Sequence, residues 1–151
     1  ADLIAAVKGG HHRSKLMDKL AFGTYNHTFE KRTSYDWLTR DQAIVDQYIA
    51  DPLCGYLFTI KGMADLLHLN TAANSDEWYQ KVRKDLPILL ISGAEDPVGG
   101  YSKGIDEVYD KLIQSGHTAV TEKLYPECRH EVLNERNKEE VYEYLYSYII
   151  K

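Results

Sequence analysis

Apolar residues in the first half of the chain recur at spacings of three and four, the pattern of helices that bury one face. Gly23 follows the first stripe and can end its helix, and Asp51-Pro52 stops the second, because the residue before a proline avoids the helical conformation. The pattern predicts a lobe of short helices. The stripes are Leu16, Met17, Leu20 and Ala21; Val45, Tyr48 and Ile49; and Ile60, Met63, Ala64 and Leu67.

Capping signals mark the starts of two helices in this lobe. Thr39 followed by Gln42 predicts a capping box, in which each side chain satisfies a free backbone amide. Asn74 or Ser75 is expected to cap a short helix that runs through Trp78. We place this helical lobe over residues 1–80.

From Leu86 onward the pattern is that of an α/β fold. Residues 86–91 are apolar at almost every position, which is typical of a strand covered on both faces in a parallel sheet. Residues 120–125 alternate apolar with polar side chains, as a more exposed strand does. An amphipathic helix separates these strands and another follows them, so residues 81–151 are predicted to form a β-α-β-α unit. One face of the first helix carries Ile105, Val108, Tyr109, Leu112 and Ile113. The second helix starts at Asn137 and is expected to bury Val141, Leu145, Tyr148 and Ile149.

Two parallel strands make no stable sheet by themselves. The sequence offers few elements to cover or flank the strand at 86–91. Its neighbours could come from a longer parent chain, from a second copy of this chain that pairs or swaps the strand, or from a strand hidden in the first 80 residues. We favour the first two sources, and so expect an incomplete sheet that joins a missing N-terminal part or self-associates.

Charge and composition narrow the classes of function. The 151 residues carry 18 Lys and Arg against 23 Asp and Glu, a formal net charge of -5, and neither half is basic enough to attract nucleic acid. No apolar run approaches the ~20 residues needed to span a bilayer, and no signal peptide opens the chain. Cys54 and Cys128 lack C-x-x-C spacing and suit a reducing compartment. We expect a cytoplasmic protein with no nucleic-acid partner and no transmembrane segment.

Asp96 and His130 are the strongest candidates for chemistry. Asp96 lies between Gly93 and Gly99 in the loop after the buried strand, and His130 lies in the loop after the next strand. Loops after neighbouring parallel strands open at the same edge of a sheet, so the two side chains can meet there. An aspartate that fixes a histidine tautomer and stabilises its imidazolium is two-thirds of a hydrolytic triad. The alternative is an Asp-Pro turn and a solvated loop histidine.

These stretches resemble the α/β-hydrolases. Residues 86–98, LPILLISGAEDPV, are similar to the strand and acid turn of that family, and residues 125–131, YPECRHE, with Asn134 and Glu135, to its histidine loop. The closest likeness is to the lysophospholipase and monoacylglycerol-lipase group, which overlaps the serine aminopeptidase group. The first lobe resembles the helical cap of those enzymes, in residues 22–26, 32–38 and 51–55.

The resemblance implies the C-terminal part of an α/β-hydrolase, with a cap over residues 1–80 and core elements over 81–151. It also implies a serine carboxylester hydrolase that acts on lysophospholipid or monoacylglycerol-like lipid esters. In such an enzyme Asp96 would hold His130, and His130 would move the proton of a serine. The resemblance implies no cofactor and no metal.

The nucleophile is where the sequence departs from the family. The family order is serine, acid, histidine, with the serine in a G-x-S-x-G elbow directly after a strand, and no such elbow precedes Asp96. The match GYSKG at residues 100–104 follows the acid, and ten residues separate Ile91 from Ser102. Ser102 is instead expected to cap the following helix. We expect no esterase turnover from the chain alone, and a serine elsewhere in the parent chain.

Other candidate residues have simpler interpretations. His11-His12 is better explained as a solvated pair than as a metal site, because adjacent histidines point apart on a helix and no carboxylate cluster follows. Trp37 and Trp78 could line an acyl pocket or pack in a core. Glu131 is expected to be solvated, and Cys128 to be a loop thiol rather than a nucleophile.

A second hypothesis belongs to a different class of function. The chain could be a noncatalytic interaction module that reuses half of a hydrolase, since exposed parallel strands are ready-made pairing surfaces. A parent chain without an upstream elbow serine would favour this hypothesis.

Overall fold

The computed structural model describes residues 4, 6–7 and 9–150. They form two compact units, each made of two stretches of chain. The first unit joins the described part of residues 1–24 to Pro52–Arg83, and the second joins Tyr25–Asp51 to residues 84–150. The second unit holds both strands together with Asp96 and His130.

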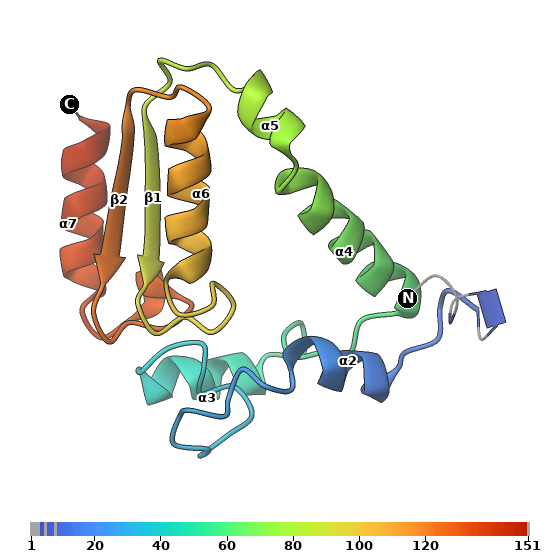
Figure 1. The fold of residues 1–151 in the computed structure, drawn as a ribbon. Helices are drawn as coiled ribbons and strands as arrows, with labels where there is room; N and C mark the ends of the chain where they lie inside the picture. Colours follow the sequence, from blue (N-terminus) through green and yellow to red (C-terminus); the bar gives the residue numbers. More distant parts are fainter. Residues whose placement is uncertain (1–3, 5, 8, 151) are drawn as a thin grey trace. The chain divides into compact units, whose positions relative to one another are not determined.

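Short helices make up the first unit, as the apolar pattern predicts. Ser75 caps the last of them by accepting a hydrogen bond from the Trp78 amide, which confirms the predicted start. An antiparallel bridge between Arg13 and Thr59 joins the two stretches of chain. Its helices include α2 (Lys15–Phe22), α4 (Ile60–Ala73) and α5 (Asp76–Lys81) (Figure 1).

Much of the apolar surface of this first unit is exposed. Ile60, Met63 and Ala64 of α4 are buried as predicted, but Leu67 is 47% exposed, so the inner stripe of that helix is shorter than predicted. Leu16 and Leu20 of α2 are also exposed. None of the helices in the described part of the chain combines the length and the apolar character that a membrane span requires.

The second unit confirms the predicted order and the parallel pairing of the strands. Ile88 lies opposite Val120 at one end of the pair, and Gly93 lies opposite Tyr125 at the other. Figure 1 shows helices α6 and α7 on opposite sides of the strand pair. The elements are β1 (Ile88–Gly93), α6 (Lys103–Gln114), β2 (Val120–Tyr125), the short 3-10 helix η1 (Val132–Asn134) and α7 (Lys138–Ile149).

A small core lies between β2 and α7. Val141 is buried as predicted and Leu145 packs against the same cluster, whereas Ile149 is 77% exposed. The prediction for Ile149 is wrong because no described element covers the last turn of α7. The buried cluster consists of Tyr125, Cys128, Val132 and Val141.

Strand β1 is less buried than the sequence predicts. It begins at Ile88 rather than Leu86, and its first four residues are only half-buried. The reason is its position: in the described part of the chain the sheet has two strands, so β1 has β2 as its one neighbour. Its other edge has no strand to pair with there.

Residues 25–51 carry α3 (Gln42–Ala50) and belong to the same compact unit as the strands, where they bind the loop after β2. The Glu131 amide donates to the Leu38 carbonyl at 2.8 Å, and the Thr39 hydroxyl donates to the Asn134 carbonyl at 3.0 Å. Thr39 therefore does not form the predicted capping box. Asp41 caps α3 instead, accepting a hydrogen bond from the Ala43 amide.

Candidate active site

Asp96 is fixed by the turn that ends β1. Its amide donates to the Gly93 carbonyl at 3.2 Å, and its own carbonyl accepts from the Tyr101 amide at 2.8 Å. The Val98 amide donates to Oδ1 of its carboxylate at 2.8 Å. The residue is only 6% exposed. The hydrogen bond from the Val98 amide thus orients the carboxylate within its own loop.

Gly93 lets this turn approach the histidine loop. A Cβ at this position would lie 2.2 Å from both the Cys128 and the Arg129 carbonyl oxygens. The Glu95 amide donates to that Cys128 carbonyl at 2.9 Å, which ties the two loops together. A glycine is required here by close approach of the backbone rather than by an unusual φ angle.

His130 lies in the loop after β2, and its ring meets Asp96. Its Nδ1 is 3.0 Å from Oδ2 of Asp96. The side chain keeps 38% of its surface exposed, so one edge of the ring can be approached. Because Nδ1 faces the carboxylate, Nε2 is the nitrogen available to another group. The structure thus brings the two sequence candidates together, 34 residues apart in the chain.

The hydrogen bond with Asp96 raises the pKa of His130 above that of an ordinary histidine. Partial burial acts in the opposite direction, and the negative charges of Asp96 and Glu131 add to the increase. The protonated ring is therefore stabilised in this position. Such an environment suits a histidine that must accept a proton during a reaction.

Two aromatic side chains stand beside the pair. The rings of Trp37 and His130 have their centroids 5.2 Å apart, and the rings of Trp37 and Tyr25 also lie 5.2 Å apart, edge to face. Burial and the charge of Asp96 together raise the pKa of Tyr25. Of the two tryptophans that the sequence offered as pocket residues, Trp37 lies at this site, and Trp78 packs edge-on against Tyr79 in the first unit.

The histidine loop is also held by a buried ionic network that the sequence analysis missed. Glu135 is fully buried and binds Arg40, and Arg129 is buried and binds Glu30. Ionic residues of this kind are normally exposed, so their burial is not evident from the sequence pattern. The one feature of the sequence that indicates such a network is the run of charged residues around His130.

Ser102 lies at the start of α6, as predicted, but does not cap it. Its φ angle is +76°, in the left-handed region, and its hydroxyl donates to the Ala94 carbonyl at 3.4 Å. The side chain makes no hydrogen bond to the amides of the first turn, because this backbone conformation points it back toward the loop after β1. The predicted capping role is therefore wrong.

The remaining candidates fall outside the pair. Burial raises the pKa of the Cys128 thiol, which keeps it neutral, and the thiol donates to Oδ1 of Asn137. Glu131 accepts a hydrogen bond from the Asn134 side chain and is half-buried rather than solvated. His11 and His12 are exposed. Among the described residues no group of three or more His, Cys, Asp or Glu side chains could hold a metal ion.

The family is decided by a match over most of the chain. A family model described as serine aminopeptidase, S33, matches residues 5–137. The chain belongs to this family of α/β-hydrolases. A search among curated proteins finds no significant match.

Solved structures agree with the family. A thermostable carboxyl esterase from Bacillus coagulans, solved with glycerol, is 29% identical and superposes with a TM-score of 0.88 over 98% of this chain and 49% of its own. A soluble variant of monoglyceride lipase from Saccharomyces cerevisiae is 17% identical, with a TM-score of 0.62 over 89% of this chain and 48% of its own. A monoacylglycerol lipase from Paleococcus ferrophilus is 16% identical, with a TM-score of 0.56 over 93% and 55%.

The S33 chain thus has part of an α/β-hydrolase fold and spans about half the length of the solved structures that it matches. The last two likenesses concern the fold alone. Esterases and lipases are prominent among these neighbours.

Proposed function

We propose that this chain supplies the acid and the histidine of a serine carboxylester hydrolase. The observation that carries the proposal is the 3.0 Å contact between Nδ1 of His130 and Oδ2 of a buried Asp96, at the carboxyl ends of two parallel strands. Catalytic groups of open α/β sheets gather at that edge. The family to which the chain belongs supports the same assignment.

The serine in this proposal comes from the half of the enzyme that this chain does not contain. The G-x-S-x-G match at Ser102 follows the acid and lies in a loop, so it does not suit a nucleophile elbow. We call the complex or longer chain that contains both halves the assembled enzyme. The family model is named for an aminopeptidase and a structural neighbour for an esterase, so experiment must decide whether the enzyme cleaves peptide or ester bonds.

In the assembled enzyme, Nε2 of His130 takes the proton of the serine hydroxyl as its oxygen attacks the ester carbonyl. The proton then passes to the departing alcohol, and an acyl-enzyme remains. His130 next takes a proton from a water molecule that attacks the acyl group, and it returns this proton to the serine oxygen as the carboxylic acid is released. Asp96 keeps Nδ1 protonated and stabilises the imidazolium in both steps.

We propose lipid esters such as monoacylglycerols or lysophospholipids as the substrates. Two observations support this choice: the neighbours include monoacylglycerol lipases, and the helical unit exposes large apolar side chains that could contact an acyl chain. We also propose that residues 1–80 form a cap over the substrate. We further propose that the enzyme is cytoplasmic. The large apolar side chains that α4 exposes are Leu66, Leu67 and Leu69.

Turnover by the assembled enzyme tests this proposal. A monoacylglycerol, a lysophospholipid, an aryl ester and an aminoacyl anilide are offered to the parent and to the Asp96→Ala, His130→Ala and Ser102→Ala variants. We expect ester hydrolysis that falls by about 10³–10⁴-fold in the first two variants and survives in the third. Full activity in Asp96→Ala or His130→Ala contradicts the assignment, and loss of activity in Ser102→Ala would make that serine the nucleophile.

A further inference from the structure

A carboxylate with no exposed surface lies five residues after His130. The side chain of Glu135 is 0% exposed, and burying a charge destabilises a protein unless the charge is paired. Four N–H groups surround it. The Arg129 and Arg40 amides donate to Oε1 at 2.8 and 3.2 Å, and the Arg40 Nε and the Arg136 amide donate to Oε2 at 2.9 and 3.3 Å. Glu135 is therefore a fully paired anchor for several stretches of backbone.

The first of these stretches contains Arg129, directly before His130. Its amide is held by Glu135, and its guanidinium donates to the Asp36 carbonyl at 2.6 Å and to the Glu30 carboxylate at 2.8 Å. The guanidinium also lies over the Phe29 ring, 4.2 Å from the centroid. Arg129 is thus held both at its amide and at its guanidinium.

His130 and the residue after it are held from the same side. The His130 amide donates to the Trp37 carbonyl at 3.4 Å, and the Glu131 amide donates to the Leu38 carbonyl at 2.8 Å. Residues 36–40 are in turn tied to Glu135 through Arg40. Glu135 therefore binds both sides of this backbone ladder.

We propose that Glu135 is a positioning residue for His130. Through the Arg129 amide and through Arg40, it holds the histidine loop where the imidazole stays within hydrogen-bond distance of Asp96. Glu135 needs no contact with the substrate. The importance of this role for catalysis rests on the proposed function. The hydrogen bond between Asp96 and His130 that Glu135 maintains can be measured in this chain alone. Supporting groups of this kind must hold a catalytic geometry to within about 0.5 Å.

The titration of His130 in the 151-residue chain tests this inference. Its imidazole signals are followed by NMR across pH and assigned by their loss in His130→Asn. We expect the pKa of His130 to fall toward the ordinary histidine value in Glu135→Ala. Asp96→Asn should lower the pKa in the parent chain, and should lower it much less when Glu135→Ala is already present, because the contact has been loosened.

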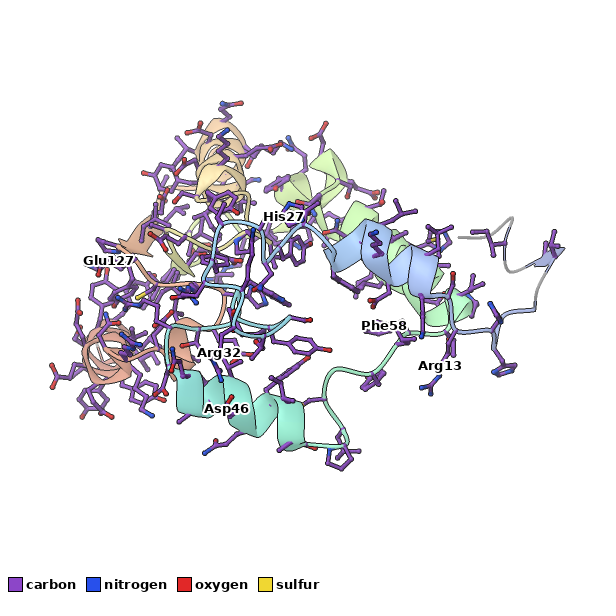
Figure 2. The ribbon with its side chains drawn as sticks, turned by 90° about the horizontal axis from the view of Figure 1, so that it is seen from below. Arg13, His27, Arg32, Asp46, Phe58 and Glu127 are labelled. Carbon is purple, nitrogen blue, oxygen red and sulfur yellow. The ribbon has the colours of Figure 1, made fainter. Side chains whose placement is uncertain are left out.

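Two further variants separate positioning from general stability. Glu127, labelled in Figure 2, also binds Arg40, at 3.1 Å. Glu127→Gln removes this carboxylate, which is 77% exposed and binds no amide of the histidine loop. It should leave the pKa of His130 unchanged. Glu135→Gln keeps the shape but turns one acceptor into a donor, which then faces N–H groups. It should lower the pKa of His130 and decides the question if Glu135→Ala does not fold.

The outcomes distinguish this inference from the proposed function. An unchanged His130 pKa in folded Glu135→Ala, or in Glu135→Gln when the former does not fold, overturns the positioning role even if the free energy of unfolding falls. An unchanged pKa in Asp96→Asn removes the Asp96–His130 coupling on which the proposed function depends. A lowered pKa in Asp96→Asn together with unchanged values in the Glu135 variants overturns the positioning role alone.

Discussion

The contact between Asp96 and His130 makes stability depend on pH in a defined direction. Its hydrogen bond raises the pKa of His130 in the folded chain. The extra stability of the charged pair is therefore fully present below the pKa of an unfolded histidine, and it is lost as the pH rises through the raised pKa of the folded chain.

We predict that Asp96→Asn loses more stability at about pH 5.5 than at about pH 9, where the histidine of both chains is neutral. Urea unfolding of the parent and the variant at both pH values measures this difference. The other histidines are common to both chains and cancel. The same loss at the two pH values would contradict the predicted pair.

Gly93 sets the distance between the two loops that carry this pair. In Gly93→Ala the new methyl carbon would lie 2.2 Å from two backbone carbonyl oxygens, and backbone atoms cannot move aside as a flexible side chain does. We expect a loss of roughly 1–3 kcal/mol in the free energy of unfolding, the usual cost of overpacking. Gly99→Ala is the matched control, because its Cβ would have no neighbour nearer than 3.6 Å. Equal effects of the two substitutions in urea unfolding would refute the steric explanation.

At the scale of elements, local signals predicted most of what the structure contains. The apolar run before Asp96 and the alternating run at 120–125 both form strands, and the two strands pair in parallel as predicted. These strands are predictable because the spacing of apolar residues along the sequence reflects which side chains are buried. The meeting of Asp96 and His130 followed from that topology. Ser75 was recognisable as a cap because its partner is three residues away.

Contacts between distant parts of the chain were not predictable in the same way. Thr39 has the sequence environment of a capping residue, yet its hydroxyl bonds to a carbonyl 95 residues away. Glu135 and Arg129 look like solvated loop residues until segment 25–51 packs over them. Exposed positions such as Leu67 and Ile149 carry an apolar pattern that no described element covers. In each case the burial or the hydrogen bonding of the residue depends on a distant part of the chain, which the local sequence pattern does not reveal.

The start of α3 provides a test at this scale. Asp41 accepts a hydrogen bond from the Ala43 amide at 3.0 Å and is the N-cap of the helix. Asp41→Ala should lower the free energy of unfolding by about 0.5–2 kcal/mol, whereas Gln42→Ala, which removes the second member of the predicted capping box, should have little effect. Thermal or urea unfolding of both variants checks this. A larger loss in Gln42→Ala would restore the capping box.

At the scale of the whole molecule, the chain spans about half of its solved relatives, and its sheet in the described residues has two strands. Strand β1 has one edge there without a strand partner, and its apolar side chains are half-buried. We predict that the isolated chain self-associates by pairing or swapping residues 86–91, because this buries the apolar side chains of the strand. We also predict that it hydrolyses no ester, because the serine and the oxyanion donors of the proposed enzyme lie outside it, and one such donor is worth about 10²–10³ in rate. Light scattering over a concentration series and an ester assay on the same sample measure both. A monomer at all concentrations contradicts the first prediction, and turnover contradicts the second.

The central claim is that His130 acts as a general base held by Asp96, and the pH profile of kcat/KM in the assembled enzyme tests it most directly. We predict that kcat/KM for an ester rises with pH through the pKa that NMR assigns to His130, which Asp96 holds above the ordinary value. In Asp96→Asn the midpoint of the rise should move to lower pH, and the plateau should fall by about 10³–10⁴-fold. An unchanged midpoint together with an unchanged plateau in Asp96→Asn would contradict this account.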